Sequence, residues 1–498
     1  MGQALRPCFA PAPRQNAGSV PRRPLNFHSI REWLPTASQH FLIGSLAVLC
    51  YVITTRFRRE QRAASTAIAW VMGLALLPYL MLPMYLLFGR RKTRPATLAR
   101  LYLRNNGSHW ASELLESMGL APAGWSPHIE LHSNGAKAQQ ALWQLIDQAH
   151  MRLDVCTFII GDDALGLETV QRLARRAQDG LAVRVLLDGI GALLLPRRYF
   201  NVLRKAGCEV AIFRPFFSMH GNGPRNLRNH RKLVIADNCR VWSGGRNLAA
   251  EYFQGSKGKA PWSDISFVLD GPSASSAAFQ FEQDWASVRQ KPARSTALDP
   301  TQLAPDASGK TAPNRASLTQ GGMTQFLPAG PDQLEDTAHA LLIAACFRAE
   351  RRILAITPYF VPDDGFRDAL RLASRRGVEI TIVIPAQSNH RLADFVRTRA
   401  MRDLAAAGVN FRMLPFMAHA KAVVVDDTLA LCGSINLDLR SLLLNHEASV
   451  VFYGRPQIEW LAEWITQTAQ TANVYTAAQP GFGRDIAEGL VQSLAFQL

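Results

Sequence analysis

Two short segments of this chain carry the same chemically active residues at the same spacing. Both fit the pattern H-x-K-x4-D-x6-G-[GS]-x-N. Its members are His230, Lys232, Asp237, Gly245 and Asn247 in the first copy and His419, Lys421, Asp426, Ser434 and Asn436 in the second. Each His-x-Lys leads an apolar run rich in β-branched residues, so we expect it on a strand, where residues i and i+2 point to the same face. Each imidazole should therefore share its space with an ammonium group.

This grouping suits the transfer of a phosphodiester, which is anionic and resists nucleophiles. Two lysines and two asparagines can neutralise and grip its non-bridging oxygens. One imidazole can attack phosphorus to form a phosphohistidine, while the other protonates the departing oxygen and later deprotonates the incoming hydroxyl. The lysines supply the positive charge, so the predicted site needs no metal. Asp237 and Asp426 end the strand runs, and we assign them to the catalytic set as orienting residues.

The segments around the two motifs also repeat, which indicates an α/β protein built from two similar halves. Residues 153–188 and residues 353–384 each read as a strand, an acidic turn, a helix and a second strand. They lie about two hundred residues apart, which is the spacing of a domain repeat. An incidental His and Lys on a surface strand would explain one motif, but it explains two matching copies poorly.

Composition divides the chain further. Residues 290–322 are rich in Pro, Ala, Ser and Thr and read as a linker. The predicted segments are a basic Pro/Arg-rich tail (1–32), a transmembrane helical hairpin (33–89), a basic connector (90–125), a first domain (126–289), the linker (290–322), a second domain (323–480) and a C-terminal tail (481–498). The linker contains Gly309-Lys310-Thr311, but the rest of a phosphate-binding loop is missing, so we expect no nucleotide or other cofactor.

The charge balance points to an anionic partner. The chain has 498 residues, with 55 Lys and Arg against 39 Asp and Glu, for a net charge of +16. Nucleic acid or an acidic membrane surface would fit this excess. The seven cysteines are scattered, with no CxxC pair, which argues against a disulfide scaffold or a zinc site and favours reduced thiols facing the cytosol.

Two uncharged runs near the N-terminus, residues 33–55 and 63–89, predict a transmembrane hairpin. The second run would span about 40 Å as a helix, against about 30 Å for the hydrocarbon core of a bilayer. Pro78 and Pro83 predict a kink in it. The alternative is a pair of buried core helices. A cleaved signal peptide is a poor fit, because the first 32 residues are polar.

Basic residues predict the orientation of this hairpin. Eleven Arg and Lys residues flank it, in residues 6–31 and 90–104, whereas its loop carries four arginines in residues 56–62. Since positive residues accumulate on the cytoplasmic side, the body of the protein should face the cytoplasm.

The paired motifs resemble those of the phospholipase D superfamily, whose members join two such copies across a pseudo-twofold axis. Residues 226–232, 244–253 and 356–363, and the hairpin end 85–91, resemble those of bacterial cardiolipin synthases. The resemblance implies two pseudo-symmetric phospholipase D-like domains, each a mixed sheet flanked by helices. It also implies that His230 is the nucleophile and His419 the general acid and base.

The same resemblance supplies further candidate site residues. Asp264 and Glu447 hold positions where a carboxylate commonly steadies the imidazole of the same or the opposite half. Gly245 stands where many superfamily members have serine, so the first half offers a bound phosphate one hydroxyl fewer than Ser434 provides in the second.

The reaction implied is the synthesis of cardiolipin at the bacterial inner membrane. One phosphatidylglycerol donates its phosphatidyl group to His230, glycerol leaves, and a second phosphatidylglycerol attacks. Hydrolysis to phosphatidic acid, or a different donor such as phosphatidylethanolamine, remains an alternative. The hairpin argues against a nuclease, so we expect no nucleic acid partner, and the two intact motifs argue against a non-enzymatic scaffold.

Two points stay open at this stage. Four aromatic residues could line an acyl groove or simply pack, namely Phe216, Phe217, Tyr359 and Phe360. Nothing in the sequence indicates an oligomeric state.

Overall fold

The computed structural model describes residues 35–58, 64–89, 109–215, 226–256, 258–289 and 317–481, with residues 483, 484 and 488. The chain divides into two compact units, Met1–Thr54 with Arg62–Leu82 and Thr55–Gln61 with Pro83–Leu498. Several predictions fall outside the described residues: the Pro/Arg-rich tail, the basic cluster of the connector, the segment 309–311, and the aromatic residues Phe216 and Phe217.

The N-terminal helices differ from the predicted pair of spans. Helix α2 (Ala37–Arg58) is the one helix among the described residues that is long and apolar enough to cross a membrane, and only 17% of its apolar window is buried. The second run is divided into α3 (Ala64–Leu76, 13 residues) and α4 (Pro78–Phe88, 11 residues). The break falls at Pro78, whose nitrogen has no hydrogen to donate to the preceding turn. Each piece is shorter than the roughly 20 residues a span requires, so the two-helix hairpin is not confirmed.

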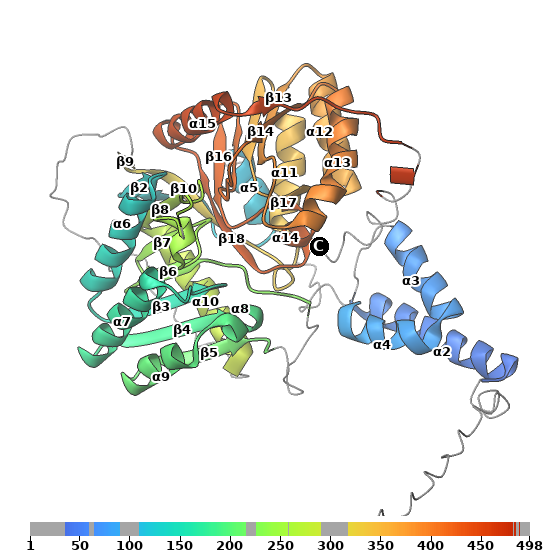
Figure 1. Ribbon diagram of the computed structural model, residues 1–498, viewed down its shortest axis with the longest axis horizontal. Helices are drawn as coiled ribbons and strands as arrows, with labels where there is room; N and C mark the ends of the chain where they lie inside the picture. Colours follow the sequence, from blue (N-terminus) through green and yellow to red (C-terminus); the bar gives the residue numbers. More distant parts are fainter. Residues whose placement is uncertain are drawn as a thin grey trace, which may run out of the picture. The chain divides into compact units, whose positions relative to one another are not determined.

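The first half of the larger unit is a mixed sheet of eight strands in the order β5-β4-β3-β6-β7-β8-β2-β9, with helices packed against it (Figure 1). Its strands are β2 (Ile129–His132), β3 (Arg152–Thr157), β4 (Ala182–Asp188), β5 (Glu209–Phe213), β6 (Leu233–Ala236), β7 (Arg240–Gly244), β8 (Ser266–Asp270) and β9 (Ser317–Thr319). Its helices are α6 (Gly135–Gln148), α7 (Ala164–Gln178), α8 (Gly189–Leu194), α9 (Arg197–Lys205), η1 (Ala250–Tyr252) and α10 (Pro272–Arg289).

The second half is a nine-stranded sheet in the order β1-β10-β18-β16-β15-β11-β13-β14-β19, beside a two-stranded ribbon, β12-β17. Its strands are β1 (Gly124–Ser126), β10 (Gly322–Ala329), β11 (Arg352–Ile356), β12 (Phe360–Val361), β13 (Glu379–Pro385), β14 (Asn410–Leu414), β15 (Ala422–Val425), β16 (Leu429–Gly433), β17 (Leu437–Asp438), β18 (Glu447–Phe452) and β19 (Asn473–Val474). Its helices are α5 (Trp110–Ser117), α11 (Thr337–Arg348), α12 (Asp364–Arg375), α13 (Arg391–Ala406), α14 (Leu439–Leu443) and α15 (Arg455–Gln470).

The two sheets repeat one topology. Seven strands of the first, β5-β4-β3-β6-β7-β8-β2, correspond in order to β14-β13-β11-β15-β16-β18-β10 of the second. The predicted repeat of strand, acidic turn, helix and strand is confirmed as β3-α7-β4 and β11-α12-β13. The acidic turns are helix caps, because Asp163 accepts a hydrogen bond from Gly166 N and Asp363 accepts one from Gly365 N.

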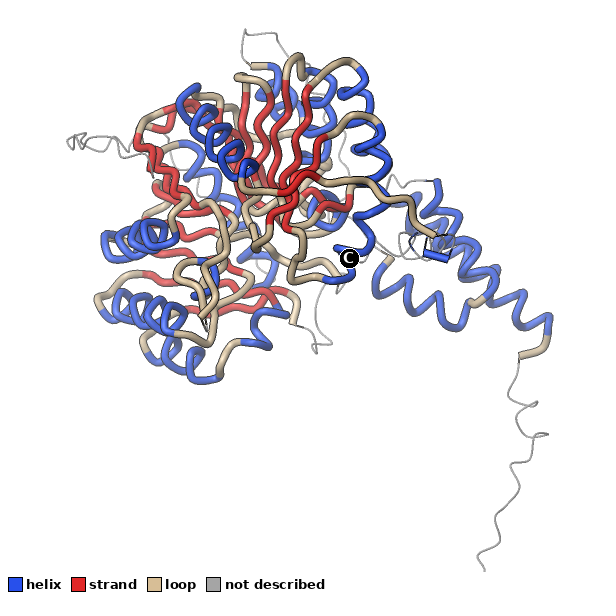
Figure 2. Tube along the Cα trace, turned by 45° about the horizontal axis from the view of Figure 1, so that its top comes forward, coloured by secondary structure: helices blue, strands red, loops and turns tan. Residues whose placement is uncertain are grey.

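The halves share a core and exchange their edges. Residues of both sheets pack with α10 and α15 in one hydrophobic cluster, in which the rings of Phe267 and Phe452 meet edge to face at 5.7 Å. Figure 2 shows the strands of the larger unit in red and the helices that flank them in blue. Strand β9, at the end of the predicted linker, pairs with β2 of the first sheet, and β1 pairs with β10 of the second. Such short edge strands lack a sequence pattern of their own, so the predicted limits of the connector, linker and domains do not coincide with the limits of the sheets. The six cysteines among the described residues are free thiols.

Candidate active site

Both motifs lie just before a strand rather than on it. His230 and Lys232 precede β6, whose first residue pairs with the end of β3, while His419 and Lys421 precede β15, which begins beside the end of β11. On their other side, β3 runs parallel to β4 and β11 runs parallel to β13. Both histidines therefore lie at the carboxyl ends of the parallel strands, where α/β proteins place their reactive groups.

A backbone hydrogen bond joins each motif to a segment of the opposite half. His230 N donates to His446 O over 2.8 Å, and His419 N donates to Ser263 O over 2.7 Å. Each motif thus lies against a strip of backbone from the opposite half. The residue that follows in each strip is a carboxylate, Glu447 after His446 and Asp264 after Ser263.

The two orienting carboxylates are consequently crossed between the halves. His230 Nδ1 lies 3.0 Å and 3.1 Å from the carboxylate oxygens of Glu447, and His419 Nδ1 lies 2.8 Å from Asp264 Oδ2. Both carboxylates are fully buried. A proton on Nδ1 would be held by the carboxylate, which leaves Nε2 of each ring with the lone pair needed for attack or proton transfer.

Gly245 and Ser434 adjoin these carboxylates, and their predicted contact with a bound phosphate stays a prediction. Ser434 Oγ donates to Glu447 Oε2 over 2.5 Å and accepts a hydrogen bond from Ala448 N. At Gly245, an added Cβ would lie 2.2 Å from Asp264 Oδ1. The first half therefore requires glycine at this position so that Asp264 can reach the histidine.

The lysines lie against their own histidines. Lys232 Nζ donates to His230 O over 2.8 Å, and Lys421 Nζ lies 2.9 Å and 3.1 Å from the two ring nitrogens of His419. Burial lowers the pKa of Lys232 to about 8 and that of Lys421 to about 7. A bound phosphodiester anion would raise both values and fix the ammonium charges.

Burial also sets the protonation of the imidazoles. It lowers the pKa of His230, and together with Lys421 it lowers the pKa of His419 to about 3. Burial would raise the pKa of both carboxyl groups, but the adjacent histidines and lysines hold the pKa of Asp264 and Glu447 below the usual range. The site without substrate therefore holds neutral imidazoles beside ionised carboxylates.

The two asparagines are held within their own loops. Asn247 Nδ2 donates to Tyr252 Oη over 2.8 Å, and Asn436 Nδ2 donates to Ser441 Oγ over 3.1 Å. Their buried amide oxygens have no hydrogen-bond partner among the described residues. These contacts support the catalytic loops, and the expected grip on phosphate oxygens stays a prediction.

Asp237 and Asp426 do not orient the imidazoles. Their carboxylates accept hydrogen bonds from three successive backbone N–H groups, of residues 150–152 and 350–352, at distances of 2.7–2.9 Å. They lie at the opposite ends of β6 and β15 from the histidines, with φ of 51° and 49°. Each aspartate closes the turn that aligns β3 or β11 with its neighbour, which is a structural role.

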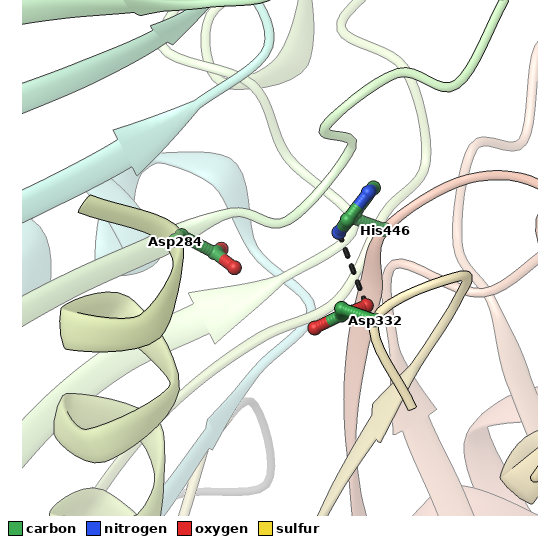
Figure 3. Close-up of side chains that lie close together, drawn as sticks. All are labelled: Asp284, Asp332 and His446. Atoms are coloured by element: carbon green, nitrogen blue, oxygen red, sulfur yellow. Dashed lines mark ion pairs between the residues drawn. The ribbon is translucent and has the colours of Figure 1, made fainter. Parts of the chain in front are cut away.

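A cluster of Asp284, Asp332 and His446 resembles a metal site by composition (Figure 3). The guanidinium of Arg231 already binds both carboxylates, with Nη1 at 2.5 Å from Asp284 Oδ1 and Nη2 at 2.9 Å from Asp332 Oδ2. His446 Nδ1 lies 3.1 Å from Asp332 Oδ1. The cluster is therefore an ion-pair network between the halves, and its position beside Glu447 matters for the site.

Sequence reasoning missed the aromatic residues that surround the imidazoles. Tyr252 and Trp262 have ring centroids 5.0 Å and 5.6 Å from that of His419, and Phe158 lies 5.2 Å from His230. No spacing rule links these residues to the motifs. Of the aromatic residues considered for an acyl groove, Phe360 is fully buried in the core of the second half, and Tyr359 donates its hydroxyl to Asn389.

Comparison with known proteins identifies the family. The family described as "Cardiolipin synthase, PLD-like domain" matches residues 142–285 and 342–469, which carry six of the seven strands of each repeat. Cardiolipin synthase A of Pseudomonas putida (strain W619) is 32% identical over 460 residues, covering 87% of this chain and 91% of that protein. Cardiolipin synthase A of Pseudomonas fluorescens (strain SBW25) is 31% identical, covering 83% and 87%.

A solved structure shows a similar fold. Phosphatidylserine synthase of Haemophilus influenzae Rd KW20 superimposes with a TM-score of 0.55 at 16% identity, covering 74% of this chain and 95% of that one. At this identity the likeness concerns the fold. The relatives and the family match together decide the assignment, and the chain belongs to the cardiolipin synthase family of phospholipase D-like enzymes, as a phosphatidyltransferase of that type.

Proposed function

We propose that this enzyme joins two phosphatidylglycerol molecules into cardiolipin and releases glycerol, through a phosphohistidine at His230. The observation that carries the proposal is the crossed pair of contacts, His230 to Glu447 and His419 to Asp264. Two imidazoles with carboxylate-held Nδ1 atoms, next to two buried ammonium groups, match the needs of a two-step phosphodiester exchange.

In the first step, Nε2 of neutral His230 attacks phosphorus, and the bond from phosphorus to the glycerol oxygen breaks. The leaving oxygen takes a proton from His419. Although the pKa of His419 is about 3 in the empty site, the negative charge of the substrate raises it. The ammonium of Lys421, at 2.9 Å from Nδ1 and 3.1 Å from Nε2, is a proton source beside the ring.

In the second step, the terminal hydroxyl of another phosphatidylglycerol attacks the phosphohistidine. His419 removes the hydroxyl proton through Nε2, and the bond between phosphorus and His230 breaks. One phosphodiester replaces another, so the exchange requires no nucleotide. Water in place of the lipid hydroxyl would release phosphatidic acid, which is the competing outcome.

The location belongs to the same proposal. Helix α2 is long and apolar enough to anchor the enzyme, and a net charge of +16 favours a surface rich in anionic lipid. We propose residence in the bacterial inner membrane, with two passes through residues 33–89 and the catalytic halves in the cytoplasm. In that arrangement α3 and α4 would form one kinked span, since packing neighbours in a bilayer can satisfy the carbonyl groups freed at a proline.

Reconstitution tests the reaction directly. Full-length enzyme in vesicles of phosphatidylglycerol alone should convert it to cardiolipin and glycerol in equal amounts, measured by mass spectrometry. The His230→Ala and His419→Ala variants should produce neither. Phosphatidic acid without cardiolipin would favour hydrolysis, and a requirement for added phosphatidylethanolamine would favour the other donor.

A further inference from the structure

Two buried arginines stand at positions of the motifs that carry no expected role. Arg231 is the residue between His230 and Lys232, and Arg246 precedes Asn247. Both side chains are almost fully buried, at 0% and 1% exposure. Burying a guanidinium is costly unless its donors are satisfied, so the partners of these two groups indicate what they do.

Arg231 binds the backbone of Glu447, the residue whose carboxylate holds the proposed nucleophile, His230. Its Nε donates to Glu447 O over 3.0 Å, and Nη2 donates to Ala329 O over 3.3 Å. Ala329 is the cross-strand partner of Glu447 where β10 pairs with β18. The other donors of the guanidinium bind Asp284 and Asp332. One side chain of the first half thus fixes the strand end of the second half from which Glu447 reaches His230.

Arg246 does the same for the other carboxylate. Its Nη2 donates to Asp264 O over 2.5 Å, and Asp264 holds His419. Its remaining donors bind the backbone oxygens of Tyr252, His132 and Ser133 and the hydroxyl of Ser266. No carboxylate among the described residues forms an ion pair with this guanidinium, so its positive charge acts mainly on Asp264.

The second copy of the motif has no such groups. Ala420 lies between His419 and Lys421, and Ile435 precedes Asn436. Both anchoring side chains therefore come from the first half, although one of them serves a carboxylate of the second. The catalytic pairs are shared between the halves, while the backbone anchors are not.

We propose that Arg231 and Arg246 are positioning residues that hold the two carboxylates against the imidazoles, Arg231 for the Glu447–His230 pair and Arg246 for the Asp264–His419 pair. This inference rests on the proposed function only in assigning the imidazoles to catalysis. A misplaced carboxylate would let the imidazole rotate away from the phosphorus, which slows the chemical step more than it weakens substrate binding.

The charges of Arg231 and Arg246 should affect catalysis differently. Asp284 and Asp332 neutralise Arg231, so it acts through geometry. Arg246 is not neutralised, and its charge also helps to keep buried Asp264 ionised. Replacing Arg246 by methionine should therefore move the acidic limb of the pH–rate profile to higher pH, whereas the charge-preserving Arg246→Lys should leave that limb in place.

Double-mutant cycles test the assignment of each arginine to its own pair. Arg231→Lys and Arg246→Lys keep the charge but cannot reproduce the fork of donors. Each is combined with Glu447→Gln and with Asp264→Asn in the full-length enzyme. The readout is kcat and KM for a water-soluble chromogenic phosphodiester, measured beside cardiolipin formation in vesicles. The soluble substrate tests the two carboxylate–histidine pairs even if the lipid product is not cardiolipin.

We expect each lysine variant alone to lower kcat by about 10- to 100-fold at a nearly unchanged KM. Arg231→Lys should cost less than about threefold when Glu447→Gln is already present, but its full factor beside Asp264→Asn. Arg246→Lys should show the reverse pattern. Factors that multiply in all four combinations, or a kcat that neither variant changes, would overturn the proposal.

Gentler variants keep the test valid if a lysine variant fails to fold, which thermal unfolding would reveal. Asp332→Asn loosens Arg231 without touching Glu447, and Ser266→Ala removes one acceptor of Arg246. Each should reproduce, at smaller size, the same selective coupling. Equal coupling of either variant to both carboxylates would also contradict the proposal.

Discussion

The two histidine sites use one motif in two different surroundings. The His230 side chain is 14% exposed and meets Phe158, whereas His419 is 5% exposed and contacts both Tyr252 and Trp262, with Lys421 against its ring. A nucleophile must reach phosphorus, while a general acid and base benefits from a neighbouring titrating group that can exchange a proton with it. The difference favours His230 as the nucleophile and His419 as the acid and base.

The carboxylates differ in the same sense. Glu447 binds the hydroxyl of Ser434 and the amide of Asn445 as well as His230. Asp264 has glycine at the position of that serine, and it binds Ile265 N instead of a hydroxyl. Duplication therefore kept the catalytic groups and altered their supports, which means that equivalent substitutions in the two halves should have unequal effects.

Replacing each histidine by alanine is the largest expected perturbation. Both variants should lose cardiolipin synthesis by about 10³-fold or more. They should differ on a nitrophenyl phosphodiester, whose leaving group needs no proton: His419→Ala should still release nitrophenol in a burst and accumulate the covalent enzyme, but His230→Ala should not. Quench-flow and intact-protein mass spectrometry measure this. A burst from His230→Ala would reverse the assignment.

Exchanging the small residues beside the carboxylates should give the next largest effect. Gly245→Ser adds a Cβ only 2.2 Å from the present position of Asp264 Oδ1. The carboxylate must therefore move away from His419, and kcat should fall by about 100-fold. Ser434→Gly removes the hydrogen bonds of its hydroxyl to Glu447 and from Ala448 N but introduces no clash, so it should cost about tenfold or less. Steady-state kinetics on the two single variants compare them, and equal losses would show that the halves are supported alike.

Much of this arrangement could be predicted from sequence. The repeat, the strands, the acidic helix caps and the paired motifs follow from spacing, because these depend on neighbours along the chain. The crossing of the carboxylates could not, since His230 and Glu447 are 217 residues apart and only the packed halves bring them together. Arg231 and Arg246 were hidden for the same reason, since groups such as Glu447 O and Ser133 O, which accept their hydrogen bonds, lie far away along the chain.

Some differences from the predictions had signals in the sequence. The short helices α3 and α4 meet at Pro78, which the sequence marks. Asp237 and Asp426 end their strands, and an aspartate at such a turn commonly binds backbone N–H groups. The exchanged edge strands β1 and β9 had no signal, because three residues carry too little pattern.

The two lysines should give the two histidine sites different pH dependences. The pKa of Lys421 is about 7 and that of Lys232 about 8, so both lose charge as pH rises through this range, and kcat/KM for an anionic substrate should fall on the alkaline side. Arginine stays charged. Lys421→Arg should therefore extend the plateau of kcat/KM to higher pH, even at a lower maximum, and Lys232→Arg should do so less. An alkaline limb that neither variant moves would assign it to another group.

The smallest effect on catalysis is expected at the motif aspartates, and it separates architecture from chemistry. Asp237 accepts three backbone N–H groups, and although burial opposes ionisation, these bonds hold its pKa below the usual range. Its contribution to stability is therefore present above the unfolded pKa of a carboxyl group and is lost as pH falls through the folded value.

Asp237→Asn tolerates the φ of 51° but weakens the acceptor, so it should destabilise the enzyme by about 1–3 kcal/mol and reduce its sensitivity to acid. Because the carboxylate lies at the far end of β6 from His230, kcat at a permissive temperature should change by less than about twofold. Asp426→Asn is the matched control in the other half. A large loss of kcat with unchanged thermal unfolding in either variant would return that aspartate to the catalytic set.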